Sequence, residues 1–84
     1  MNYYVYILRS LKNNDIYIGS TSNVNNRFRL HNLGRVKSTK GYLPWELIES
    51  QKFNNRSEAV QRERFLKLHQ QKEIIKKKYG LVAK

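Results

Sequence analysis

Two short segments near the start of the chain constrain its fold more than any other feature. Residues 4–8 read Tyr-Val-Tyr-Ile-Leu, and residues 16–19 read Ile-Tyr-Ile-Gly. Side chains alternate along a strand, so one face of each segment carries tyrosine and the other carries aliphatic residues. The intervening residues 10–15, Ser-Leu-Lys-Asn-Asn-Asp, are rich in turn formers. The pattern predicts a β-hairpin that brings its three tyrosines close together, beside one another across the strand pair.

The three tyrosines of this hairpin, Tyr4, Tyr6 and Tyr17, have two interpretations. They are either ordinary strand aromatics that cover a core, or phenols gathered for phosphate chemistry or nucleic-acid contact. Taken alone they favour the first interpretation. The strongly basic composition of the chain raises the second.

The length and composition of the chain limit what it can be. Its 84 residues suffice for one domain, over residues 1–84, with a single modest core. It has no cysteine, so disulfides and thiolate-bound metals are excluded, and any metal needs oxygen or imidazole ligands. It contains neither an apolar run of membrane-spanning length nor a signal-peptide pattern. We therefore expect an intracellular, soluble, cytoplasmic protein without a membrane partner, nucleoid-associated if it is bacterial.

The charge of the chain is unusual for its size. Lysine and arginine total 17 against 6 acidic residues, a formal net charge of +11, which is more than solubility requires. A densely negative partner is the simplest explanation, and nucleic acid is the leading one. The alternative is a generally basic surface, as in ribosome-associated or membrane-peripheral proteins.

A short helix is predicted directly after the hairpin. Residues 20–23 are polar and suited to capping a helix, residues 24–33 fit its body, and Gly34 ends it. Arg27 and His31 lie one turn apart on the face that also carries two apolar residues.

A loop and a third strand follow this helix. Residues 34–44 have no periodicity and predict a basic surface loop that carries Arg35, Lys37 and Lys40. Residues 45–53, which begin with the chain's one tryptophan, predict the strand.

The next helix carries an acid in an unexpected place. Asn55 with a glutamate three residues later resembles a capping box, and the helix is predicted over about residues 56–69. Ala59, Glu63 and Leu66 share one of its faces. If that face packs on the sheet, the carboxylate is costly to bury unless it is paired or binds a cation.

The last segment predicts a short amphipathic helix over about residues 70–80, ending near Gly80. It carries Lys76, Lys77 and Lys78, which also fit a simple solvated basic face. The chain shows no repeat, linker or low-complexity tract, so a second domain is not expected.

Five elements between about residues 3 and 67 carry a family resemblance. They are Tyr-Val-Tyr at residues 4–6, Tyr-Ile-Gly at residues 17–19, Arg27, His31 and Glu63. Their order and spacing resemble the GIY-YIG nuclease domain, most closely its small stand-alone members. The resemblance implies an α+β fold in the order β-β-α-β-α-α, a three-stranded antiparallel sheet flanked by helices. The reading of the individual segments predicts the same arrangement.

The resemblance also implies a chemistry, hydrolysis of a DNA phosphodiester with one divalent cation, Mg²⁺ or Mn²⁺. Carried over by position, Tyr17 orients or deprotonates the attacking water, with Tyr6 as its neighbour. Arg27 stabilises charge on the scissile phosphate, and His31 assists proton transfer or contacts the phosphate. Glu63 is the sole protein ligand of the metal.

The expected function is therefore a structure-selective or weakly sequence-selective DNA endonuclease, acting in DNA repair or recombination. Basic residues of the loop and tail are expected to bind phosphates: Arg35, Lys37, Lys40, Lys76, Lys77 and Lys78. RNA stays open as a substrate, and the oligomeric state stays open too. The main alternative is a nucleic-acid-binding module on the same fold with little or no activity, and a more remote one is a basic protein-interaction subunit.

The chain departs from the family pattern at three places, which bear on turnover and substrate class more than on fold. Tyr4 stands where the family name has glycine, and Ser20 stands where excision-repair proteins have lysine. Residues 73–78 lack the asparagine that larger nucleases carry after the metal-binding glutamate. Apart from the resemblance, Glu63 is more simply explained as an ion-pair partner of a neighbouring base, Arg62, Arg64 or Lys67, than as a metal ligand.

Overall fold

The three predicted strands form one antiparallel sheet in the order β2-β1-β3. The protein is described by a computed structural model over residues 2–81. The strands are β1 (Tyr3–Ser10), β2 (Ile16–Thr21) and β3 (Trp45–Phe53). Because β1 pairs with both other strands, β2 and β3 are the two edges of the sheet.

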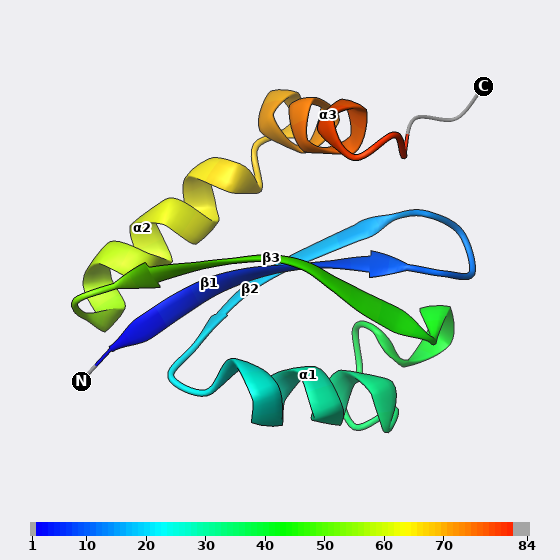
Figure 1. Ribbon diagram of the computed structural model, residues 1–84, viewed down its shortest axis with the longest axis horizontal. Coiled ribbons are helices and arrows are strands. Elements are labelled where there is room, and N and C mark those ends of the chain that lie inside the picture. Colours follow the sequence, from blue (N-terminus) through cyan, green and yellow to red (C-terminus); the bar gives the residue numbers. More distant parts are fainter. Residues whose placement is uncertain (1, 82–84) are drawn as a thin grey trace.

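Helices cover both faces of this sheet. They are α1 (Val24–Asn32), α2 (Arg56–Leu66) and α3 (His69–Lys78). Figure 1 shows α1 on one side of the sheet and α2 with α3 on the other. The predicted α+β class and element order are confirmed. No helix within residues 2–81 is long and apolar enough to cross a membrane.

The hairpin register separates the three tyrosines more than we expected. Tyr6 lies opposite Gly19, and Tyr17 lies opposite Leu8, so the two tyrosines are diagonal neighbours with ring centroids 6.2 Å apart. Tyr4 lies opposite Thr21, four positions from Tyr17 along β2, which is about 13 Å at the usual rise per residue. The prediction is right for Tyr6 and Tyr17 and wrong for Tyr4.

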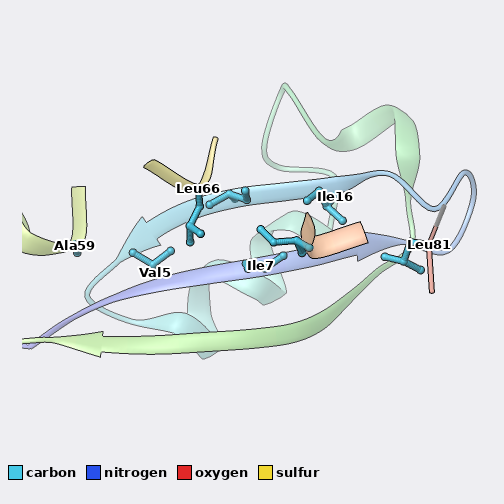
Figure 2. Close-up of a cluster of buried hydrophobic side chains, with 8 residues drawn as sticks. Val5, Ile7, Ile16, Ala59, Leu66 and Leu81 are labelled. Atoms are coloured by element: carbon cyan, nitrogen blue, oxygen red, sulfur yellow. The ribbon is translucent and has the colours of Figure 1, made fainter. Parts of the chain in front are cut away.

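Two apolar layers result from the alternation of side chains along the strands. Val5, Ile7, Ile16 and Ile18 face α2 and α3, where the buried residues are Ala59, Leu66, Ile75 and Leu81; Figure 2 shows most of this layer. The opposite layer is centred on Tyr6, Leu8 and Trp45 and includes residues of α1. Tyr6 and Tyr17 therefore belong to the layer between the sheet and α1.

The second helix is shorter than predicted, whereas its beginning is as expected. The Asn55 side chain accepts a hydrogen bond from the Glu58 N–H at 2.9 Å, which caps α2. The helix ends at Leu66, because Leu68 has extended backbone (φ −61°, ψ 140°) that separates α2 from α3. No glycine or proline marks this break, so it could not be predicted from a helix stop signal.

The segment over residues 34–44 is not the plain surface loop we expected. It contains a 3₁₀ helix, η1 (Lys40–Tyr42), and the Thr39 side chain is buried. The Trp45 indole N–H donates to the Thr39 carbonyl at 3.0 Å. Asn32 holds the start of β3, since its amide donates to the Trp45 carbonyl at 2.9 Å and accepts from the Trp45 N–H at 2.6 Å. These contacts fix the segment between α1 and β3.

The layer beneath α2 predicts a clear contrast between two isoleucines. Ile7 is 1% exposed and Ile74 is 57% exposed. Ile7→Ala should lower the free energy of unfolding by about 2–5 kcal/mol through the cavity it leaves. Ile74→Ala should change it by about 0.5 kcal/mol or less. Urea unfolding of both variants measures this, and equal effects would contradict the core assignment.

Candidate active site

The site begins with the contact between Gly19 and Tyr6 across the hairpin. A Cβ atom added to Gly19 would lie 2.6 Å from the Tyr6 hydroxyl oxygen and 2.7 Å from Cζ of its ring. It would also lie 3.1 Å from the Tyr17 ring. The Tyr6 ring is rigid, so only glycine lets it cross the β2 backbone at this position. The glycine of the second motif therefore has a steric reason.

A buried chain of hydrogen bonds connects Tyr6 to α1. The Tyr6 hydroxyl lies 2.8 Å from His31 Nε2, and His31 Nδ1 lies 2.8 Å from Thr39 Oγ1. Thr39 Oγ1 in turn donates to the Val36 carbonyl at 3.3 Å. The arrangement that satisfies all these groups has a neutral imidazole with its proton on Nδ1. In that tautomer Nε2 accepts a hydrogen bond from the Tyr6 hydroxyl.

Burial sets the protonation of this pair. Burial, helped by the positive charge of Arg27, lowers the pKa of His31 from 6.5 to about 4. Burial also raises the pKa of Tyr6 to about 12, although Arg27 opposes the shift. At neutral pH both side chains are therefore uncharged, and His31 is 0% exposed. In this position His31 reaches Tyr6 and does not reach a phosphate in solvent.

Tyr17 and Arg27 lie at the surface of this buried pair. Both are partly exposed, in contrast to Tyr6 and His31. The Tyr17 ring packs on His31 with centroids 4.8 Å apart and on Trp45 with centroids 6.4 Å apart. Arg27 lies one turn before His31 on α1 and acts on the pKa of both buried groups. Tyr17 and Arg27 are thus the members of the group that solvent reaches.

The carboxylate of Glu63 is held from two sides. Ser20 Oγ donates to its Oε1 at 2.6 Å, and the Lys67 ammonium pairs with its Oε2 at 2.6 Å. Burial tends to raise the pKa of Glu63, but the hydrogen bonds from Lys67 and Ser20 outweigh it and lower the pKa below its usual value. The carboxylate is charged at neutral pH, with its side chain 17% exposed.

The five predicted catalytic residues fall into two groups on opposite faces of β2. One group lies between α1 and the sheet and consists of Tyr6 and Tyr17 from the strands and Arg27 and His31 from α1. The other is Glu63, which reaches β2 from α2. The negative charge of Glu63 nevertheless raises the pKa of Tyr6, so the two groups lie within electrostatic range.

Sequence reasoning missed two residues of the site. Ser20 was noted only as a departure from the family pattern. Its position gave a signal, because it shares a strand face with Ile16 and Ile18 and is the one polar residue of that row. Thr39 gave no comparable signal, since it lies in an aperiodic segment, and only the course of that segment brings it to His31.

The predicted phosphate-binding residues differ in solvent exposure and in whether they form ion pairs within the protein. Arg35, Lys37 and Lys40 are exposed in the segment before β3. Lys76 pairs with Asp15 at 3.2 Å, and Lys78 pairs with Glu49 at 3.6 Å; these pairs join α3 to the hairpin turn and to β3. Lys77 is exposed between them. The tail lysines therefore combine a structural contact with their basic charge.

The low pKa of His31 predicts a specific pH dependence of stability. The unfolded chain takes up a proton as the pH falls through about 6.5, whereas the folded His31 does so only near 4. The stability that this group contributes is thus complete above about pH 6.5 and is lost as the pH falls towards 4. Between about pH 8 and pH 5 the loss should be about 2 kcal/mol.

Urea unfolding at several pH values tests this prediction. His31→Gln should remove most of the decline, whereas His69→Gln, which removes an exposed imidazole, should keep it. A decline of the same size in both variants would show that another group causes it.

Comparisons with known proteins agree with this geometry. The family model described as the GIY-YIG catalytic domain matches residues 2–79. A UPF0213 protein of Oceanobacillus iheyensis is 42% identical over 62 residues, 73% of this chain and 71% of the relative. A UPF0213 protein of Staphylococcus haemolyticus is 37% identical over 75 residues, 88% of this chain and 90% of the relative.

A solved structure extends the comparison to the fold. The solution NMR structure of a UPF0213 protein from Bacillus halodurans is similar to this chain with a TM-score of 0.55 and 35% sequence identity. The match covers 89% of this chain and 82% of that protein. The resemblance seen in the sequence is confirmed. On the family model, the relatives and the shared fold, the chain belongs to the GIY-YIG catalytic-domain family.

Proposed function

We propose that this protein is a divalent-metal-dependent endonuclease that hydrolyses phosphodiester bonds of DNA. The observation that carries the proposal is that a part-exposed phenol and guanidinium, Tyr17 and Arg27, lie on the α1 side of β2, while Ser20 of the same strand holds the Glu63 carboxylate on the other side. Membership of the GIY-YIG family supports a nuclease-like role, and nucleases of this family generally use divalent metals. Phosphodiester hydrolysis needs an activated water and charge compensation on the phosphoryl oxygens.

Tyr17 is the phenol in the better position to meet the attacking water. Tyr6 is buried, its pKa is about 12, and its proton is directed at His31. Tyr17 is part-exposed and packs on His31. In this proposal Tyr17 orients or deprotonates the attacking water. In this arrangement the rings of Tyr6 and His31 pack against the Tyr17 ring.

Arg27 is suited to the charge that develops on the phosphate. Its guanidinium is always charged and presents donors in a planar fork that matches phosphate oxygens. Because α1 is held by the His31 contact with Tyr6 and by the Asn32 contacts with β3, Arg27 extends from a fixed helix. Positioning of this kind lowers the reorganisation needed during the reaction.

Glu63 fits the role of a single protein ligand for a divalent cation. Within residues 2–81 no group of three or more potential ligands could hold a metal, so a cage built from protein alone is not available there. Mg²⁺ keeps several waters and takes substrate phosphate oxygens as ligands, so one or two carboxylates suffice. Each carboxylate oxygen has two acceptor positions, which lets Glu63 keep its Ser20 contact. The cation would supply charge neutralisation and polarise the phosphate or its attacking water.

DNA is the proposed substrate because the chain is basic. The lysines and arginines expected to contact phosphates lie in the segment before β3 and in α3. A net charge of +11 favours binding through phosphates without base readout. We propose Arg35, Lys37, Lys40 and the tail lysines Lys76, Lys77 and Lys78 as phosphate contacts. Binding of this kind implies structure-selective or weakly sequence-selective cleavage, as in DNA repair or recombination. RNA is the alternative substrate.

One observation favours a second candidate function, a nucleic-acid-binding module with little activity. Lys67 already occupies Oε2 of Glu63, which is an oxygen that a cation would use. If the ammonium does not leave, the same surface binds DNA without cleaving it.

The Glu63→Gln variant separates these two functions. Wild-type protein should cleave DNA of a nicked, branched or single-stranded panel only with Mg²⁺ or Mn²⁺. Glu63→Gln should lose this cleavage while keeping its fold and DNA affinity. Glu46→Gln, which changes a carboxylate at the start of β3, is the matched control and should cleave like the wild type. A wild type that binds every substrate and cleaves none would establish the binding module instead.

The Tyr17→Phe variant tests the role of the phenol. It keeps the ring that packs on His31 and removes the hydroxyl, so the single-turnover cleavage rate should fall by about a hundredfold or more. Stability and DNA affinity should change little. Tyr42→Phe removes the hydroxyl of an exposed tyrosine in η1 and should leave the rate unchanged. Cleavage by Tyr17→Phe at the wild-type rate would make Tyr17 a packing residue.

A further inference from the structure

The two contacts of the Glu63 carboxylate differ in kind. Ser20 Oγ lies 2.6 Å from Oε1 and belongs to β2, so the sheet fixes its position. The Lys67 ammonium lies 2.6 Å from Oε2 and stands at the end of a long side chain that is 49% exposed. A hydroxyl on a strand holds the carboxylate in place, whereas a flexible ammonium can leave it.

Lys67 is held near Glu63 by its place on α2. It is the C-cap residue of the helix, one turn after Glu63. A cation at this position is favoured by the helix dipole and by a glutamate four residues earlier. The ion pair therefore forms without help from the rest of the chain. It neutralises a carboxylate that is only 17% exposed and would otherwise be costly to bury.

We propose that Lys67 is the resident counter-ion of Glu63 and competes with the divalent cation for its carboxylate. The inference rests on the proposed role of Glu63 as the metal ligand. Two positive charges cannot both contact Oε2 without strong repulsion, because at such separations the Coulomb energy is large even at an effective dielectric constant of about 20. Cation binding therefore requires that the Lys67 ammonium moves away, and the ion pair sets the affinity for the cation.

The Lys67 side chain is exposed enough for its ammonium to move away from Glu63 into solvent. Half of the side chain is open to solvent, so it can move without unfolding α2. A DNA phosphate is a second anionic partner for the ammonium and forms charge-assisted hydrogen bonds of the same kind as those of the Glu63 carboxylate. DNA that reaches the site would therefore draw Lys67 from Glu63 and free Oε2 for the cation. Lys67 thus acts as a positioning residue that keeps the carboxylate paired until substrate arrives.

Titration of the full chain with Mn²⁺ in the absence of DNA tests this inference. The signal of free Mn²⁺ in electron paramagnetic resonance reports binding without any cleavage. Lys67→Met keeps the aliphatic stem and removes the charge, so it should bind Mn²⁺ about three- to tenfold more tightly than the wild type. Lys67→Arg keeps the charge and should bind no more tightly than the wild type.

Two controls isolate the ion pair. Lys52→Met removes one positive charge from an exposed position on β3 and should change the affinity by less than about twofold. Glu63→Gln, alone and combined with Lys67→Met, should abolish the site. Thermal unfolding confirms that each variant is folded, and Lys67→Gln replaces Lys67→Met if that variant is not.

The outcomes distinguish this inference from the proposed function. Equal Mn²⁺ affinity of wild type and Lys67→Met, at a site that Glu63→Gln removes, would overturn the role of Lys67 and leave Glu63 as ligand. Tighter binding that persists when Glu63→Gln is added would place the ion elsewhere and overturn it as well. If no variant has a site that depends on Glu63, the metal assignment fails and the inference fails with it.

Discussion

The passage of the Tyr6 phenol over the backbone of Gly19 is the constraint on which the site depends. There is no room for a Cβ atom at Gly19, and the phenol that uses this space reaches His31 on α1. A side chain at position 19 would push Tyr6 off the imidazole and leave two buried polar groups without partners, each costing about 1–3 kcal/mol. This contact thus connects the hairpin to α1, which the Asn32 contacts with β3 also hold in position. Tyr17 and Arg27 take their places from those two elements.

The free edge of β2 explains how residues of opposite faces can serve one site. Tyr17 and Gly19 face α1, whereas Ser20 faces α2 and holds Glu63 there. In a central strand the sheet would separate these groups. Because β2 pairs only with β1, nothing in the sheet blocks the path around its outer edge. Edge strands usually need protection against pairing with other chains; here Ser20 of β2 holds the charged Glu63 of α2 against this strand.

The sequence predicted those parts of the fold that depend on local patterns. The hairpin, β3, the Asn55 cap of α2 and the helix before Gly80 all follow from alternation, helical spacing or capping residues. What it could not predict depends on the course of the backbone where no local pattern marks it. The burial of Thr39 follows from its contacts with His31 and Trp45, and the break at Leu68 follows from a backbone turn without glycine or proline. Tyr6, Tyr17, Arg27 and His31 were expected to act together, but burial divides them into a hidden pair and an exposed pair.

The positive net charge of the chain opposes cation binding at the carboxylate of Glu63. A protein with a net charge of +11 repels a divalent cation, and one carboxylate attracts it weakly. The same charge attracts the phosphate backbone of a nucleic acid, which brings the negative charge and the oxygen ligands that the site lacks. Until then the carboxylate must be kept charged and oriented at the sheet edge. Ser20 supplies the orientation and Lys67 the charge balance. In the proposed mechanism, this ion pair and a cation bound together with substrate are two states of one arrangement.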